Sequence, residues 1–353
     1  MNFPIRILSL SLLAILPALA APEKWDDDPN GIKVFILAGQ SNMVGYGKTE
    51  TGGNPEWTPG DKSTPKEIKG GVGCLRHLAV HDDQYPEYDF SSLLENPEQP
   101  ASSPWKKRPD VKVWWRDGHS GKLGGGIRKG DLGPPFQGGN GKWFGPEYAF
   151  GQVLGDYYKD HDVLIIKTAW GGHSLAGNFR PPSAVEKRGG EVGASYKAMF
   201  EYTRECLDQL GEHFPEWKGK GYQIVGFGWH QGFNDRVSKD PSAEYHENLP
   251  DFIADVRKEF GKPELPFVIA STGMAPKGGV EMPPYSGYSE VERAQLWAGT
   301  EPPQNVLSAD TRPFWREAKD AVSTMGYHWN HSGYSYFMVG KVLGDRMVQL
   351  LEQ

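Results

Sequence analysis

Short apolar runs alternate with helix-like stretches along most of this chain of 353 residues, and no other feature constrains the fold as strongly. Runs rich in β-branched and other apolar residues indicate buried strands, whereas apolar residues at helical spacing indicate helices. Such alternation predicts an α/β three-layer sandwich, in which helices cover both faces of a mostly parallel sheet of about five strands. The predicted strands are residues 32–38, 163–168, 222–228, 266–271 and 305–309, and the predicted helices are about 146–159, 194–213, 244–260, 288–298 and 333–352.

Residues 46–145 interrupt this alternation with little periodicity and with many glycines, prolines and tryptophans. We expect a loop-rich insertion after the first strand, within a single domain of residues 21–353, and residues 111–115 are a candidate extra strand. The tryptophans of the insertion suit either the core or contact with sugar rings, and the sequence leaves both roles open. They are Trp57, Trp105, Trp114, Trp115 and Trp143.

Residues 1–20 have the pattern of a signal peptide. Arg6 supplies the positive charge, residues 7–16 form a short apolar stretch, and Ala18-Leu19-Ala20 is a small-x-small cleavage pattern. We therefore expect cleavage after Ala20 and export to the periplasm or the extracellular space. The apolar stretch is too short for a membrane span, and no later segment is long enough for one.

Composition narrows the classes of partner. The net charge of −7 gives no basic footprint for nucleic acid or for an anionic membrane surface. The two cysteines, Cys74 and Cys206, could pair in an exported chain, but the sequence does not settle this. No cysteine cluster of the zinc type is present, and no interface pattern stands out, so we expect a monomer without a bound metal.

Four blocks of polar residues and glycines lie at predicted loops. Residues 39–42 (Gly-Gln-Ser-Asn), 169–174 (Ala-Trp-Gly-Gly-His-Ser) and 229–235 (Trp-His-Gln-Gly-Phe-Asn-Asp) each follow a predicted strand, and 327–333 (Tyr-His-Trp-Asn-His-Ser-Gly) precedes the last helix. Loops that follow parallel strands meet at one edge of a doubly wound sheet, so these blocks can form one site. Ser41, at the end of a buried strand, is the candidate nucleophile.

In this order, the four blocks resemble those of the SGNH hydrolases, and in particular the sialate O-acetylesterase-like group, which is also called carbohydrate esterase family six-like. The resemblance covers most of the chain after residue 20. It implies a flavodoxin-like fold and a serine esterase that removes acyl groups, chiefly acetyl, from a carbohydrate. It implies no metal and no organic cofactor. Ser41 matches the family's nucleophile, and His328 matches its histidine.

The resemblance also assigns roles in the reaction. Ser41 would attack the ester carbonyl, and His328 would take the serine proton and later give it to the departing alcohol. The oxyanion would be bound by the backbone N–H of Ser41, by that of Gly171 or Gly172, and by the side chain of Asn234 or Gln231. The sequence does not decide which member of each of these pairs is the donor.

Two positions depart from the family pattern. Phe233 stands where many relatives have a glutamate, and Met325 stands where relatives often have an aspartate three residues before the histidine. The acid that orients His328 could then be Asp310 or Asp320, or a backbone carbonyl could take its place. These departures keep a non-catalytic carbohydrate-binding protein as an alternative, beside a lipase or thioesterase on the same fold.

Several residues could compete for these roles. Ser174 nearly imitates a nucleophile elbow, but Pro181 and Pro182 argue against the helix that must follow directly. His331 competes with His328, whereas we expect His230 to be structural or part of the pocket wall and not a base. A last pair, His77 and His81, has helical spacing without a third metal ligand, so we expect them in a solvated loop.

Overall fold

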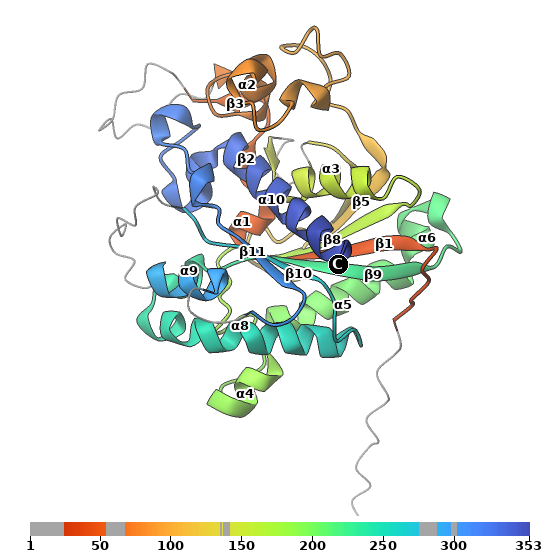
Figure 1. The fold of residues 1–353 in the computed structure, drawn as a ribbon, viewed down its shortest axis with the longest axis vertical. Coiled ribbons are helices and arrows are strands. Elements are labelled where there is room, and N and C mark those ends of the chain that lie inside the picture. Colours follow the sequence, from red (N-terminus) through yellow and green to blue (C-terminus); the bar gives the residue numbers. More distant parts are fainter. Residues whose placement is uncertain (1–24, 54–67, 135, 137–141, 275–287, 298–301) are drawn as a thin grey trace, which may run out of the picture.

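A seven-stranded sheet forms the centre of the molecule (Figure 1), which we describe from a computed structural model. The structure describes residues 25–53, 68–134, 136, 142–274, 288–297 and 302–353, so the predicted signal peptide and Trp57 lie outside the described residues. In spatial order the strands are β11 (Val306–Ala309), β10 (Phe267–Ala270), β9 (Tyr222–His230), β1 (Ile32–Gly39), β8 (Val163–Ala169), β5 (Arg108–Arg116) and β6 (Ile127–Leu132).

The five predicted strands are all present and set the topology of the sheet. Numbered along the chain, β1, β8, β9, β10 and β11 lie in the order 2-1-3-4-5, which is the flavodoxin-like arrangement. Neighbouring strands among these five are parallel, and β5 pairs in parallel with β8. The strand order reverses between β1 and β9, so the loops after these two strands flank the crevice where such folds bind ligands.

Helices cover both faces of the sheet, which confirms the predicted three-layer sandwich (Figure 1). Side chains of β1 alternate between the faces: Val34 and Ile36 join one core cluster, and Phe35 and Leu37 join the other. The first cluster packs beneath α5 (Ala194–Asp208), α8 (Lys239–Glu259) and α9 (Tyr288–Leu296), and the second packs beneath α3 (Glu147–Tyr157) and α10 (Gly333–Leu351).

Short elements complete the described part of the chain. They are the helices α1 (Ser41–Val44), α2 (Leu75–Val80), α4 (Pro182–Arg188), α6 (Leu210–His213) and α7 (Phe233–Arg236), the strands β2 (Gly47–Lys48), β3 (Thr51–Gly52), β4 (Ile68–Lys69) and β7 (Trp143–Phe144), and the 3-10 helices η1 (Asp82–Gln84), η2 (Phe90–Leu93), η3 (Pro215–Trp217), η4 (Arg312–Phe314), η5 (Ala318–Asp320) and η6 (Gly326–His331). No helix in the described ranges is both long and apolar enough to cross a membrane.

The insertion is more regular than its sequence indicated. The candidate extra strand exists as β5, and the antiparallel strand β6 extends the sheet to seven strands instead of about five. Trp114 and Trp115 on β5 are fully buried, so these two tryptophans belong to the core. The segment with His77 and His81 was predicted as a loop, but it begins with helix α2, and the two rings lie 4.3 Å apart.

The two cysteines do not pair. Cys74 and Cys206 are both free and buried. Cys206 lies in α5 within the first core cluster, and the Sγ of Cys74 accepts a hydrogen bond from the N–H of His77 at the start of α2. Burial raises the pKa of both thiols above its ordinary value.

Candidate active site

Ser41 lies at the point where β1 turns into the short helix α1. Gly39 ends the strand with φ +154°, and a Cβ there would lie 2.2 Å from the carbonyl oxygen of His230, so only glycine fits this turn. Ser41 is 8% exposed and is the first residue of α1. A residue in the first turn has no intrahelical acceptor for its N–H, which leaves that group available as a donor.

The side chain of Gln40 connects the serine block to the block after β9. Its Oε1 accepts hydrogen bonds from the backbone N–H of Gly232 (3.2 Å) and of Asn234 (3.1 Å). Its Nε2 donates to Oδ1 of Asn234 at 2.9 Å. The residue before Ser41 therefore fixes both the backbone and the side-chain amide of Asn234.

The glycine block after β8 lies against the same amide. Nδ2 of Asn234 donates to the carbonyl oxygen of Gly172 at 2.7 Å. The N–H of Gly171 donates to Gly118 at 3.1 Å, whereas the N–H of Gly172 has no protein acceptor among the described residues. Of the two candidate glycines, Gly172 therefore has the available N–H, and it lies at the exposed rim of the site.

Gln231 is 1% exposed, and its side chain is fully engaged within the protein. Its Nε2 donates to Oδ2 of Asp235 (2.6 Å) and to the carbonyl oxygen of His173 (3.0 Å), and its Oε1 lies 3.2 Å from the hydroxyl of Tyr245. The primary amide has two hydrogens, so these bonds leave none for a ligand. The geometry thus separates Gln231, which is part of the scaffold, from Asn234, which lies at the rim.

Asp235 holds the glycine block from below. Its carboxylate is fully buried and accepts hydrogen bonds from the N–H groups of Leu175 (2.9 Å) and Ala176 (2.8 Å). Burial raises the pKa of Asp235 to about 6, although these donors oppose the shift. The loop after β8 is therefore fixed to α7 by a buried carboxylate, which the sequence had placed only within a motif.

His328 lies in η6, in a loop held beside α1. Nδ2 of Asn42 donates to the carbonyl oxygen of Tyr327 at 3.1 Å, and the hydroxyl of Tyr336 donates to Oδ1 of Asn42 at 2.7 Å. The ring of His328 stacks on Tyr46, with centroids 4.1 Å apart and planes 8° apart. No hydrogen bond joins Ser41 to His328 within the described ranges, and such bonds are often long in enzymes without a bound substrate.

The histidines of this loop lie in a poorly solvated environment. Burial, followed by the nearby His331 and His119, lowers the pKa of His328 to about 3. Burial, together with the charge of Lys48, lowers the pKa of His331 to about 4. Both imidazoles are therefore neutral at pH 7, which is the form in which a histidine can accept a proton.

Three consecutive residues after His328 have left-handed backbone conformations. Trp329, Asn330 and His331 have φ values of 53°, 50° and 58°. Asn330 holds this turn, because its carbonyl oxygen accepts from the N–H groups of Val322 (3.1 Å) and Ser323 (2.9 Å). Its Nδ2 donates to the carbonyl oxygen of residue 316 at 3.0 Å. Non-glycine residues rarely occupy this region, so the surrounding contacts must impose the turn.

Neither candidate acid is brought to His328. Asp310 is exposed and forms an ion pair with Arg312 at 2.7 Å. Asp320 is exposed and lines a different hollow of about 470 Å³, together with Tyr85 and Tyr334. In the part of the chain that the structure describes, the groups that shift the pKa of His328 include no carboxylate.

The other serine and histidines that could take part in the reaction have contacts of their own. The Oγ of Ser174 accepts from the N–H of Gly177 at 3.1 Å, and the next helix, α4, begins only at Pro182. The ring nitrogens of His173 lie within hydrogen-bond distance of Ser195 Oγ (2.6 Å) and of a backbone carbonyl oxygen (2.7 Å). His230 is 1% exposed, and burial lowers its pKa to about 4, as suits a residue in the wall.

One buried ion pair below Ser41 was not found from the sequence. Nζ of Lys167 lies 2.6 Å from Oε2 of Glu147, and both side chains are fully buried. Lys167 also donates to the carbonyl oxygen of Val44 at the end of α1 (2.6 Å), and Glu147 accepts from the N–H of Gly145 (2.9 Å). The sequence feature that could have indicated this pair is Lys167 itself, a lysine that follows four apolar residues of a buried strand. The pair connects α1 to β8 and α3.

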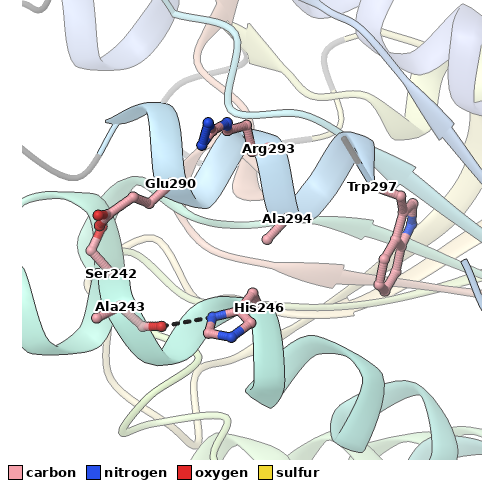
Figure 2. A pocket seen from close by; sticks show the side chains of 7 residues that line it. All are labelled: Ser242, Ala243, His246, Glu290, Arg293, Ala294 and Trp297. Carbon is pink, nitrogen blue, oxygen red and sulfur yellow. Dashed lines mark hydrogen bonds between the residues drawn. The ribbon is translucent and has the colours of Figure 1, made fainter. Parts of the chain in front are cut away.

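A second hollow, of about 360 Å³, lies between α8 and α9 (Figure 2). It contains none of the residues predicted for the reaction, and the N-terminal half of α8 forms one wall. The only hydrogen bond drawn between its lining residues joins His246 Nδ1 to the carbonyl oxygen of Ala243 at 2.8 Å. The lining residues are Ser242, Ala243, His246, Glu290, Arg293, Ala294 and Trp297.

The strand order and the helices on both faces define an α/β three-layer sandwich of the flavodoxin-like type, as the sequence predicts. Residues 131–337 match the family described as "carbohydrate esterase, sialic acid-specific acetylesterase". This match covers more than half of the chain, so the protein belongs to that family. Membership confirms the predicted enzyme class, a carboxylic ester hydrolase of the carbohydrate esterase type.

Several solved structures are similar to this chain, among them the following two. A protein from Arabidopsis thaliana, with 17% sequence identity, aligns over 90% of this chain and 98% of its own, and the TM-score of 0.51 indicates a shared fold. A carbohydrate acetylesterase from Xanthomonas citri has 13% identity and a TM-score of 0.43, over 89% of this chain and 56% of its own. No curated protein matches the sequence.

Proposed function

We propose that this protein is an exported serine esterase that removes acyl groups, chiefly acetyl, from the hydroxyls of a carbohydrate. The observation that carries the proposal is the convergence of three predicted blocks around Gln40. Its side chain binds Asn234, and Asn234 binds Gly172, so the residue before Ser41 is linked to both other candidate donors. A carbohydrate as the alcohol follows from the family to which the chain belongs.

The reaction would proceed through an acyl-enzyme. Oγ of Ser41 attacks the ester carbonyl carbon while His328 takes its proton, and the carbonyl π electrons move to oxygen. The tetrahedral intermediate collapses, the bond to the sugar oxygen breaks, and His328 returns the proton to that oxygen. A water molecule then attacks the acyl-serine by the same two steps, which releases the carboxylic acid and restores the hydroxyl of Ser41.

Three donors would stabilise the oxyanion. They are the backbone N–H of Ser41 at the start of α1, the N–H of Gly172, and the second hydrogen of Asn234 Nδ2. A fixed donor aimed at charge that develops in the transition state is worth about 2.7–4 kcal/mol. Gln231 supports this arrangement from the interior, because its own amide hydrogens bind Asp235 and the backbone of His173.

The first test is hydrolysis of p-nitrophenyl acetate by the protein without residues 1–20. Ser41→Ala and His328→Ala should each lower the rate to near the uncatalysed background and leave the circular dichroism spectrum unchanged. Ser174→Ala is the matched control, because it removes a serine hydroxyl from the neighbouring block, and it should keep wild-type activity. A folded Ser41→Ala variant with near wild-type activity would refute the proposal.

The substrate class needs a second experiment. A series of p-nitrophenyl esters from acetyl to long acyl chains should show a preference for acetyl, and acetylated sugars should release acetate. A preference for long chains would identify a lipase or thioesterase instead. Binding of sugars by calorimetry without any turnover would identify a non-catalytic carbohydrate-binding protein.

Export can be tested independently of the activity. We expect the protein to leave the cytoplasm and residues 1–20 to be removed. Cell fractionation followed by N-terminal sequencing should find a mature chain that begins at Ala21. A full-length chain that stays in the cytoplasmic fraction would contradict this part of the proposal.

A further inference from the structure

The imidazole of His328 has aromatic neighbours where an acid was expected. The rings around it are those of Tyr46, Tyr327 and His331. In a serine–histidine pair, a carboxylate usually holds the imidazole in its orientation and tautomer through a hydrogen bond. Among the described residues, no carboxylate forms a hydrogen bond or an ion pair with His328, and the contacts of its ring are aromatic.

The contact with Tyr46 differs in geometry from the others. The planes of Tyr46 and His328 are 8° apart with centroids at 4.1 Å, whereas Tyr327 meets the imidazole edge-on at 61° and 4.6 Å. His331 lies further away, at 6.0 Å. Parallel stacking covers one face of an imidazole but leaves its edge, which carries both nitrogens, free for proton transfer.

Tyr46 is itself fixed by the backbone on both sides. The N–H of Gly45 donates to the carbonyl oxygen of Ser41 at 2.9 Å, and a Cβ on Gly45 would lie 2.2 Å from Cα of Gly145. On the other side, Gly47 pairs with Phe144 in the two-stranded ribbon β2–β7. The ring of Tyr46 therefore projects from a segment that is anchored directly to the serine helix.

We propose that Tyr46 is a positioning residue, whose ring holds the imidazole of His328 in the plane needed for proton transfer, in place of an acidic partner. This inference rests on the proposed function. The same short segment would thus supply the nucleophile at residue 41 and the support for its base at residue 46.

Two variants of Tyr46 separate the role of its ring from that of its hydroxyl, and a third variant serves as the control. Tyr46→Phe keeps the stacked ring and should stay within about twofold of wild-type kcat, whereas Tyr46→Leu should lower kcat about 10–100-fold, since misplaced catalytic groups cost up to 10²-fold. KM for p-nitrophenyl acetate should change by less than about twofold, because the ring acts on the base. Tyr157→Leu is the control, because it removes a tyrosine from the surface of α3, and it should match the wild type.

The pH profile distinguishes positioning from a loss of general stability. Groups that face the imidazole are His331 on its own loop, His119 after β5, and Tyr46 and Tyr327. Without the stacked ring, water reaches the imidazole, so the acid limb of kcat/KM should move upward in Tyr46→Leu and stay in place in Tyr46→Phe. If Tyr46→Leu fails to fold, Tyr46→Met fills the space without a flat ring and gives the same test.

The outcomes separate this inference from the proposed function. If Ser41→Ala is inactive but Tyr46→Leu or Tyr46→Met retains the wild-type kcat and acid limb, the positioning role is wrong and the esterase mechanism stands. Loss of activity in Tyr46→Phe to the same extent as in Tyr46→Leu would also overturn it, because the hydroxyl would then matter. If Ser41→Ala stays active, the proposed function itself fails.

Discussion

Two amides three positions apart, Gln231 and Asn234, show how much a single residue's role depends on its surroundings. Both follow β9, and the sequence offered both as oxyanion donors. The choice could not be predicted, because it depends on hydrogen bonds to residues distant in the chain or across a turn, among them His173 and Tyr245. Only the folded structure shows that Gln231 lies inside the scaffold.

This difference predicts that substitution of Asn234 lowers activity, whereas substitution of Gln231 lowers stability. Asn234→Ala should lower kcat for an acetyl ester about 10²–10³-fold, because one proposed oxyanion donor is lost. Gln231→Leu should instead lower the free energy of unfolding by about 1–3 kcal/mol, because the buried carboxylate of Asp235 loses a donor. Steady-state kinetics and urea unfolding of both variants check this. A catalytic loss in Gln231→Leu without destabilisation would reverse the assignment.

The low pKa of His328 predicts the acid side of the activity profile. A base must be neutral, and a pKa lowered from its usual 6.5 to about 3 keeps the imidazole neutral as the pH falls. We therefore expect kcat/KM to stay level from pH 7 to about pH 5 and to decline only as the pH approaches about 3. Initial rates corrected for spontaneous hydrolysis test this, and a half-loss near pH 6.5 would contradict it.

The residue that orients His328 could not be predicted from the sequence. The candidates were Asp310, at the end of a predicted strand, and Asp320, but the paths of the loops place their carboxylates elsewhere. The stacking of Tyr46 on His328 has no sequence motif that would predict it, because a tyrosine near a glycine-rich turn can have many roles. The sequence showed that position 325 is a methionine instead of the aspartate that relatives often have, but it did not show which residue contacts His328 instead.

At the scale of elements, the apolar strands were predictable and the polar ones were not. β1, β8, β9, β10 and β11 are short apolar runs, and each was placed to within a few residues. β6 was missed because it lies at the edge of the sheet and its sequence, Ile-Arg-Lys-Gly-Asp-Leu, has no apolar face. Helix α4 was missed because Pro182 reads as a breaker, although proline fits the first helical turn.

The helix that carries Ser41 depends on the buried pair below it. Lys167→Met should destabilise the protein by about 3–5 kcal/mol, because it leaves the carboxylate of Glu147 buried without its counter-charge. The double variant Lys167→Met/Glu147→Gln should recover part of this loss, since no uncompensated charge remains. Urea unfolding monitored by tryptophan fluorescence gives the free energies. Equal destabilisation of the single and double variants would show that the pair acts by packing alone.

At the scale of the whole molecule, two separate cores hold the sheet, and neither needs a covalent cross-link. Cys206 lies in one core and Cys74 beside the other, and both are fully buried. We expect the folded protein to be unreactive with a thiol reagent such as DTNB and to release two equivalents of colour only when unfolded. Reductant should leave the melting temperature unchanged. If the unfolded protein released no colour with DTNB, the two cysteines would form a disulfide.

Because residues 329–331 have left-handed backbone conformations, we expect this segment to lose its native structure first when denaturant is added. Each such residue costs about 1–2 kcal/mol relative to an ordinary conformation, so the turn persists only while Asn330 keeps its partners in residues 316–323. This segment can therefore relax at a denaturant concentration that leaves the sheet intact. In a urea series, esterase activity should disappear before the far-UV circular dichroism signal changes, so inactivation would precede unfolding of the sheet. Coincident transitions would contradict this.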